Sequence, residues 1–257
     1  MNSLYVNGTK MIDDPELVLF DKDGTIIDIH HYWTSMIGIR ADFISDRWFS
    51  KIKQQDNIKE RLKSAMGVDI KTGRIKQDGP VGIKPRPYIV NVATNVVADA
   101  GISIGNDAME KLFSDVDMYT SSNMKPLLKL LPGVLNLLKS LQCCGVNAAV
   151  VSTDITSRAL KAMQELGIDK YFCSVKGGDS VCNTKPAADL ANLVVKEGRF
   201  STEKTAVIGD HPVDIQMGIN AGITTNIGVL TGLSSDAAFE NMKCEIVTNL
   251  KSVHIRC

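Results

Sequence analysis

Short apolar runs and amphipathic helical patterns alternate along much of the chain, and this alternation constrains the fold more than any other feature. The apolar runs are rich in β-branched residues and are bounded by turn residues, as buried parallel strands are. They are ELVLF (16–20), VNAAVVS (146–152), TAVIGD (205–210), TTNIGV (224–229) and EIVTNL (245–250). Helical patterns at 131–145, 156–168 and 185–198 separate the later runs. The alternation predicts an α/β fold, with a doubly wound parallel sheet in a Rossmann-like core.

Residues 30 to 118 interrupt this pattern. They contain four segments with helical periodicity, together with a loop rich in Gly and Pro at 69–87. The helical segments lie at 30–52, 53–67, 88–101 and 106–119. A helical insert after the first core strand is the simplest account. The expected domains are therefore an α/β core formed by 1–29 and 119–257 and an α-helical insert at 30–118.

The charge balance bears on the kind of partner. Lys and Arg number 29 and so do Asp and Glu, which leaves no basic footprint for nucleic acid or an anionic membrane. No apolar run approaches the roughly 18–20 residues that cross a bilayer, and the first residues lack a signal-peptide pattern. We therefore expect a cytoplasmic protein with a small-molecule partner, and the sequence does not indicate an oligomeric state.

Six cysteines are present, and no two of them have CxxC spacing. Neither a zinc site nor a disulfide framework is indicated, so we expect buried, reduced thiols.

The segment FDKDGT (20–25) follows the first apolar run, at a point where the chain must turn. Ligands bind outside the carboxyl ends of strands in open parallel sheets, and Asp21 is expected there. Asp21 and Asp23, two residues apart around a turn at Gly24, repel one another unless a cation or a proton intervenes. Such a pair suits Mg²⁺, or an aspartate nucleophile with a neighbouring acid/base. Taken alone, the segment is also compatible with an Asp-Gly turn that caps the next helix.

Polar residues follow other predicted strands in the same way. Ser152, with Thr153 next to it, ends the strand at 146–152, where a hydroxyl and backbone N–H groups can hold a phosphate oxygen. Lys185 precedes a predicted helix whose first residue is expected to be Pro186. Asp210 and Asp214 follow the strand at 205–210. Each signal is common, but their order and placement favour a single phosphate-handling site.

With these residues in place, the sequence resembles the haloacid dehalogenase superfamily, in its phosphoglycolate-phosphatase-like branch. DKDGT matches the first motif, the strand ending at Ser152 the second, Lys185 the third and GDHPVDIQMGINAG (209–222) the fourth. The first and fourth motifs are specific, whereas the second and third are loose. The branch carries a helical cap between its first two motifs, and the insert at 30–118 agrees in position and character.

The resemblance implies a Mg²⁺-dependent phosphatase that acts on a small organic phosphate monoester. Asp21 would form an aspartyl-phosphate, and Asp23 would protonate the leaving alcohol and then deprotonate water. The side chains of Asp21 and Asp210, the backbone carbonyl of Asp23, and Asp214 would hold Mg²⁺. Lys185, Ser152, Thr153 and Thr25 would bind phosphate. Thr25 is equally well explained as a helix-start hydroxyl.

An acid at position 23 favours phosphate esters over dehalogenase chemistry, because the family's dehalogenases lack an acid there. A phosphomutase acting on a sugar phosphate remains an alternative that the core motifs do not separate from hydrolysis. His211 departs from the usual fourth motif, and an exposed role is expected for it. In the insert, a solvated side chain is expected for Arg40, and a stiff loop for Lys84 and Arg86.

Overall fold

The structure is a computed structural model that describes residues 2–50, 55–80 and 84–257. Two compact units divide the chain: the core unit, Met1–Ile29 with Leu128–Cys257, and the helical unit, His30–Leu127. The boundary expected at residue 118 falls inside helix α4 (Asn106–Ser122), because this helix continues past the predicted segment.

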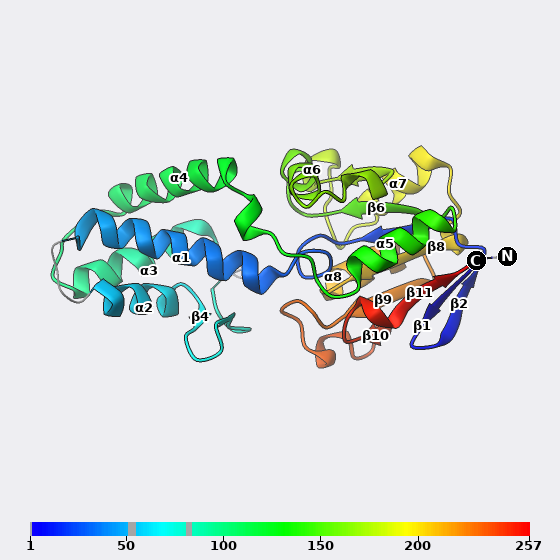
Figure 1. Cartoon of the computed structure of the whole chain (residues 1–257), viewed down its shortest axis with the longest axis horizontal. Coiled ribbons are helices and arrows are strands. Elements are labelled where there is room, and N and C mark those ends of the chain that lie inside the picture. Colours follow the sequence, from blue (N-terminus) through cyan, green and yellow to red (C-terminus); the bar gives the residue numbers. More distant parts are fainter. Residues whose placement is uncertain (1, 51–54, 81–83) are drawn as a thin grey trace. The chain divides into compact units, whose positions relative to one another are not determined.

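The core unit is built on a six-stranded sheet in the order β10-β9-β8-β3-β6-β7 (Figure 1). Every neighbouring pair in it is parallel. The strands are β3 (Leu17–Phe20), β6 (Asn147–Val151), β7 (Ser174–Lys176), β8 (Thr205–Gly209), β9 (Thr225–Val229) and β10 (Glu245–Val247). β3 and β8 are buried along their whole length, as the continuous apolar runs predict. The predicted doubly wound α/β core is confirmed.

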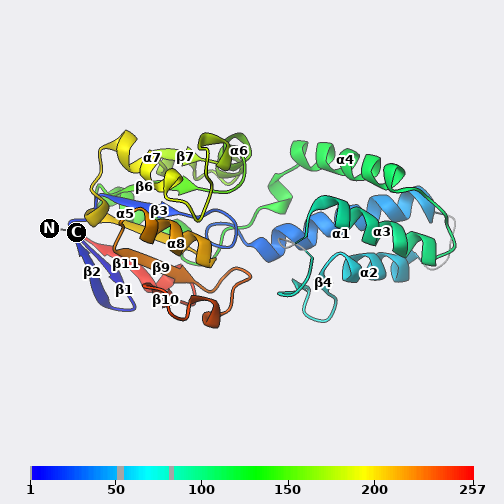
Figure 2. The ribbon, with the colours of Figure 1, turned by 180° about the vertical axis from the view of Figure 1, so that it is seen from behind.

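Four helices accompany this sheet: α5 (Val134–Cys143), α6 (Thr156–Glu165), α7 (Asp189–Gly198) and α8 (Pro212–Asn220). α7 and α8 share one face, where Leu190 and Met217 join Leu17 and Leu19 of β3 in one buried cluster. The strand order reverses direction after β7, and right-handed crossovers, the general rule for parallel strands, would then put α5 and α6 on the opposite face (Figures 1 and 2). Helices on both faces leave the ends of the strands free to carry a site.

A second, antiparallel sheet of the core unit was not predicted from the sequence. It has the order β11-β1-β2 and consists of β1 (Ser3–Val6), β2 (Thr9–Asp13) and β11 (Val253–Arg256). β1 pairs Ser3 with Arg256, so the two ends of the chain lie side by side. Single-turn 3₁₀ helices complete the description: η1 (Lys125–Leu127), η2 (Asp169–Tyr171), η3 (Gly178–Ser180), η4 (Thr202–Lys204), η5 (Asp236–Phe239) and η6 (Leu250–Ser252).

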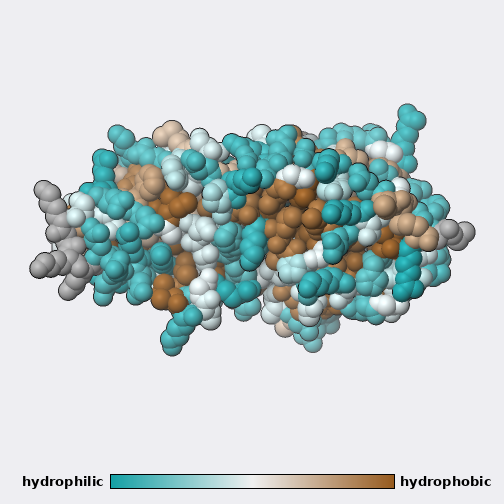
Figure 3. All heavy atoms as spheres, in the orientation of Figure 1, coloured by the Kyte–Doolittle hydropathy of each residue, from teal (hydrophilic) through white to brown (hydrophobic). Residues whose placement is uncertain are grey.

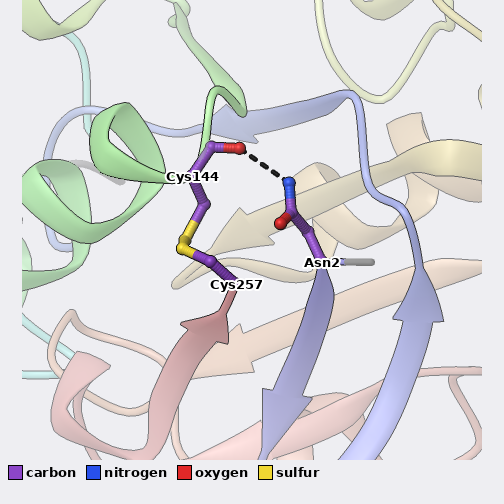
Figure 4. Close-up of a disulfide and its surroundings, with 3 residues drawn as sticks. All are labelled: Asn2, Cys144 and Cys257. Carbon is purple, nitrogen blue, oxygen red and sulfur yellow. Dashed lines mark hydrogen bonds between the residues drawn. A yellow bond between two sulfur atoms is a disulfide. The ribbon is translucent and has the colours of Figure 1, made fainter.

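A disulfide joins Cys144, which follows α5, to Cys257, which follows β11, with their Cα atoms 5.5 Å apart (Figure 4). The Asn2 amide donates a hydrogen bond to the Cys144 carbonyl at 2.7 Å beside it. The expectation of buried, reduced thiols was wrong on two counts, since the free cysteines 143, 173 and 182 are exposed. Spacing along the sequence gave no signal because the bonded pair is 113 residues apart.

The helical unit contains α1 (Ile29–Trp48), α2 (Gln55–Ala65), α3 (Arg86–Asp99) and α4. All four predicted helices of the insert are present, although the predicted ends at 51–54 lie outside the described residues. A short hairpin, β4 (Val68–Asp69) with β5 (Arg74–Ile75), occupies part of the Gly- and Pro-rich segment.

Two predictions about cations of the helical unit were wrong. Arg40 is buried rather than solvated, with its guanidinium 3.5 Å from Asp117 and 4.6 Å from the centre of the Phe113 ring. Arg86 is the first residue of α3 rather than a loop residue, and it pairs with Glu110 and Asp117.

Within the described ranges, no helix combines the length and apolarity needed to cross a membrane. Hydrophilic residues cover most of the surface visible in Figure 3, with smaller apolar areas between them.

Candidate active site

Three neighbouring strands of the large sheet end at one place in the core unit. β3 lies between β6 and β8, and Phe20, the last residue of β3, pairs with Val150 and with Ile208. Asp21 follows β3 directly, and its backbone N–H donates to the Ile208 carbonyl at 2.9 Å. The carboxyl ends of these strands therefore bring together three segments that are far apart in the sequence.

Lys185 is the centre of the hydrogen bonding at this edge. Its ammonium donates to Asp21 Oδ1 at 2.6 Å and to Asp214 Oδ1 at 2.6 Å. The lysine side chain is only 1% exposed, so it depends on these two acceptors in place of water. Lys185 thus connects the acid that follows β3 with an acid in the first turn of α8.

Asp210, which follows β8, packs closely between two glycines. A Cβ atom on Gly24 or on Gly232 would collide with the Asp210 carboxylate, and Gly24 has φ +91°, a conformation that other residues rarely adopt. Thr25 donates to Asp210 Oδ1 at 3.3 Å, and Thr231 donates to the Gly24 carbonyl at 2.6 Å. The turn at Gly24 and the loop after β9 therefore hold this carboxylate from two sides.

The charges of this cluster are unequal. Asp21, Asp210 and Asp214 each place one carboxylate oxygen within 4.8 Å of the others, while Lys185 is the one cation bonded to them among the described residues. Burial, followed by repulsion from Asp21 and Asp214, raises the pKa of Asp210 well above its usual value. Burial also raises the pKa of Asp21, against the opposing effect of Lys185. When ionised, the three acids would carry more negative charge than the single bonded lysine neutralises.

Lys185 shows the reciprocal effect. Burial lowers its pKa, but the neighbouring carboxylates of Asp21 and Asp214 outweigh burial and hold that pKa above the usual value. The amine is therefore cationic at physiological pH.

The donor set of this cluster fits Mg²⁺. Asp21, Asp210 and Asp214 supply carboxylate oxygens, the hard ligands that Mg²⁺ prefers, and their spacing allows them to face one ion. A divalent cation would also remove the repulsion that raises the pKa of Asp210. The residues present therefore suit the metal that the sequence predicted.

The structure places the remaining predicted residues on the same edge of the core unit. Asp23 is two residues after Asp21, with a side chain that is 35% exposed. Ser152 follows β6 and is buried, whereas Thr153 is exposed. Thr25 is fully buried and starts no helix, because α1 begins at Ile29, so the helix-start interpretation of Thr25 was wrong.

Two details of the third and fourth motifs differ from expectation or extend it. α7 begins at Asp189 rather than at Pro186, because a turn closed by Ala187 N–H on the Thr184 carbonyl (3.0 Å) precedes it. His211 is exposed, as expected, and it caps α8: its Nδ1 accepts from the Val213 N–H at 3.3 Å.

The sequence did not point to Lys22, Asp154, Thr231 or Gly232. The last two follow β9, and only the fold shows that they reach the turn at Gly24 and the Asp210 carboxylate. Lys22 was visible inside the first motif, but nothing in the sequence showed that its partner would be Asp154.

Comparison with known proteins places the chain in a family. A family model described as haloacid dehalogenase-like hydrolase matches residues 86–227, more than half of the chain. The chain therefore belongs to the haloacid dehalogenase-like hydrolases, and the family expected from the sequence is confirmed. The matched residues include Lys185 and Asp210, whereas the segment around Asp21 lies before them.

Curated relatives carry phosphatase names. A phosphoglycolate phosphatase from Shigella boydii is 30% identical over 139 residues, which cover 54% of this chain and 54% of that protein. The pyrophosphatase PpaX from Halalkalibacterium halodurans is 26% identical over 121 residues, covering 47% of this chain and 56% of the relative. The chain thus spans just over half the length of these two relatives.

Solved structures share the fold. A protein from Thermotoga maritima, provisionally named a beta-phosphoglucomutase, superimposes with a TM-score of 0.64 at 21% identity, covering 92% of this chain and 96% of its own. A haloacid dehalogenase-superfamily hydrolase of subfamily IA from Geobacter sulfurreducens gives a TM-score of 0.59 at 15% identity, with 92% and 93% covered. At these identities the likeness shows the fold alone.

Proposed function

We propose that this protein is a Mg²⁺-dependent phosphatase that hydrolyses a small organic phosphate monoester through an aspartyl-phosphate on Asp21. The observation that carries the proposal is the contact of Lys185 with Asp21 and Asp214 beside Asp210, at the carboxyl ends of parallel strands. A relative named phosphoglycolate phosphatase supports this class of substrate, and one named pyrophosphatase supports the hydrolysis of a small phosphate more generally.

In the first step the Asp21 carboxylate attacks phosphorus, and the bond between phosphorus and the ester oxygen breaks. Asp23 gives its proton to the departing alkoxide, so that an alcohol leaves and Asp23 becomes a carboxylate. The partly exposed side chain of Asp23 is suited to this role because it must reach the leaving group.

In the second step water attacks the phosphorus of the aspartyl-phosphate. Asp23 takes a proton from that water, the bond between phosphorus and the Asp21 oxygen breaks, and inorganic phosphate and a free carboxylate result. Asp23 is then protonated again, and the cycle is complete.

Positive charge is required because the nucleophile and the substrate are both anionic. Lys185 would hold a phosphate oxygen while it stays bonded to Asp21, and the hydroxyls of Ser152, Thr153 and Thr25 are the other proposed phosphate contacts. Asp21, Asp210, Asp214 and the backbone carbonyl of Asp23 are the proposed ligands of Mg²⁺. When bound, the ion would neutralise charge on the transferring phosphoryl group.

The alternative proposal is a phosphomutase, in which the phosphoryl group on Asp21 goes to a second hydroxyl of a sugar phosphate. The provisional name of the Thermotoga maritima structure is compatible with it, although the likeness concerns the fold. Only the acceptor differs, so the two reactions are separated by whether inorganic phosphate is released.

The test is phosphate release from p-nitrophenyl phosphate and from a panel of alkyl metabolite phosphates, with and without Mg²⁺. We expect release that requires Mg²⁺ in the native chain. Asp21→Asn should reduce it by about a thousandfold or more, because the nucleophile is lost. Asp13→Asn is the matched control, since Asp13 is an exposed acid on β2 that pairs with Lys10.

Circular dichroism of each variant separates loss of function from loss of fold. Full activity of folded Asp21→Asn would contradict the mechanism. No phosphate from any ester, together with isomerisation of a sugar phosphate, would favour the phosphomutase.

A further inference from the structure

Lys22 is the charged residue of the first motif that the proposed mechanism does not use, although it lies between the two acids of that motif. Its side chain is only 6% exposed. The ammonium is 2.9 Å from Asp23 Oδ1 and 2.7 Å from Asp23 Oδ2, and it is 3.1 Å from Asp154 Oδ2. A buried lysine thus connects the proposed acid/base to the loop that follows β6.

The backbone on the side of Lys22 is fixed by the turn that the motif makes. The Lys22 carbonyl accepts hydrogen bonds from the N–H groups of Ile26 (3.0 Å) and Ile27 (2.9 Å). Gly24 N–H donates to the Ile27 carbonyl at 2.8 Å, which closes the same turn. The Lys22 backbone, from which the side chain projects, therefore cannot move without breaking the hydrogen bonds of this turn.

The other end of the connection is fixed as well. Asp154 N–H donates to Ser152 Oγ at 3.1 Å, and the Asp154 carbonyl accepts from Gly178 N–H at 2.8 Å. Arg158 donates to Asp154 Oδ1 at 3.0 Å, which leaves Oδ2 facing Lys22. Asp154 is therefore an acceptor whose position is set by its own neighbours.

Without the contact with Lys22, the Asp23 side chain would be expected to adopt other orientations. Its side chain is 35% exposed, so it could rotate toward water, and the negative charge of Asp21 lies two residues away. An ammonium that bonds both of its oxygens selects one orientation and offsets that repulsion. Orientation matters for a proton donor because a displacement of about 1 Å can cost about a hundredfold in rate.

We propose that Lys22, held in place by Asp154, is a positioning residue that orients the Asp23 carboxylate for proton transfer to the leaving group. The inference deepens the proposed function and rests on it, since it assigns a task within the same reaction. It predicts that losing Lys22 harms the protonation of the leaving group more than any other part of catalysis.

Leaving groups of different basicity test this prediction. 2,4-Dinitrophenolate departs without a proton, whereas an alkoxide requires one, so the dependence on the leaving group reports on Asp23. For Lys22→Met we expect kcat/KM to fall about a hundredfold for the best alkyl phosphate of the panel, within the usual range for general acid catalysis. For 2,4-dinitrophenyl phosphate the loss should stay within about threefold, because the proton is not needed.

Two further variants make the test specific. Lys10→Met is the matched control, because Lys10 also pairs with an aspartate but lies on β2 and is exposed. This variant should leave kcat/KM unchanged for both substrates. In Asp23→Asn, which has no acid to orient, adding Lys22→Met should cause no further loss on the alkyl ester, since residues that act as one unit are not additive.

Equal losses on both substrates, or additive losses in the double variant, would overturn the inference and leave the phosphatase proposal intact. A wild-type chain that releases phosphate from no ester would instead overturn the proposed function. Should Lys22→Met fail to fold, Asp154→Asn replaces it: the lysine stays but loses its charged anchor. For Asp154→Asn we then expect a smaller fall in kcat/KM that is again confined to the alkyl phosphate, and the absence of this fall would overturn the inference.

Discussion

Each unit of this protein contains a cluster of charges, and the two clusters are built differently. The acidic cluster of the core unit consists of Asp21, Asp210, Asp214 and Lys185, so its carboxylates outnumber its cation. The arginine cluster of the helical unit places Arg40 and Arg86 over the Phe113 ring and pairs these two cations with two anions, Glu110 and Asp117. One cluster is unbalanced and the other is balanced.

The difference teaches where ligand binding is to be expected. A balanced cluster satisfies its own charges and contributes to the packing of helices. An unbalanced one keeps a surplus that favours an incoming cation, and after burial, repulsion from Asp21 and Asp214 contributes to the raised pKa of Asp210. The imbalance, rather than the presence of buried charge, distinguishes the candidate active site from a structural ion-pair network.

The sharpest test of this comparison removes the cation of the acidic cluster. In Lys185→Met, three carboxylates would remain buried without their cation, and breaking a buried pair in this way costs about 3–5 kcal/mol. Urea unfolding in EDTA measures the loss. Added Mg²⁺ should restore part of the stability because it supplies the missing positive charge. A loss below about 1 kcal/mol would show that the acids are not held as charged groups.

A second variant separates stability from function within the core unit. Cys144 precedes β6 and therefore lies toward the amino ends of the strands, away from the acids at their carboxyl ends. Cys144→Ser should lower the free energy of unfolding by about 2–4 kcal/mol, because the disulfide closes a long loop. Phosphate release by the folded variant should not change.

The control for this variant is Cys143→Ser, which alters the neighbouring free and exposed thiol. Equal stability of the two variants in non-reducing buffer would contradict the structural role of the disulfide.

The smallest effect is expected in the arginine cluster. Arg40→Met keeps an apolar chain against Phe113, and Asp117 keeps its pairing with Arg86. Asp117 and Glu110 have side chains that are 39% and 45% exposed, so water solvates the charge that loses its partner, and we expect a change within about 1 kcal/mol. The same urea titration measures it, and a loss as large as that of Lys185→Met would remove the distinction between the clusters.

The sequence predicted the parts of the fold that depend on local patterns. β3, β6, β8 and β9 fall on the apolar runs because a strand buried on both faces reads as a continuous apolar segment. β1 and β11 were missed because their pairing joins Ser3 to Arg256 across almost the whole chain, which no local pattern can show. The disulfide escaped prediction for the same reason.

The residues of the candidate site also divide into those that local sequence predicts and those that depend on tertiary contacts. Asp21, Asp210 and Lys185 were predictable since each directly follows a strand or lies before a helix, where the fold places functional groups. Arg40 was misjudged because its burial depends on Phe113 and Asp117 of another helix. The packing of Gly232 against Asp210, and the link from Lys22 to Asp154, likewise arise from tertiary contacts.

The most direct test of the central claim is the melting temperature of the EDTA-treated protein titrated with Mg²⁺. A ligand that binds only the folded state raises stability by about 2.7 kcal/mol at a hundred times its Kd. We predict a rise for the native chain and for Asp117→Asn in the arginine cluster, and none for Asp210→Asn. No rise in the native chain, or an equal rise in Asp210→Asn, would contradict the claim that the unbalanced acidic cluster is the metal-dependent active site.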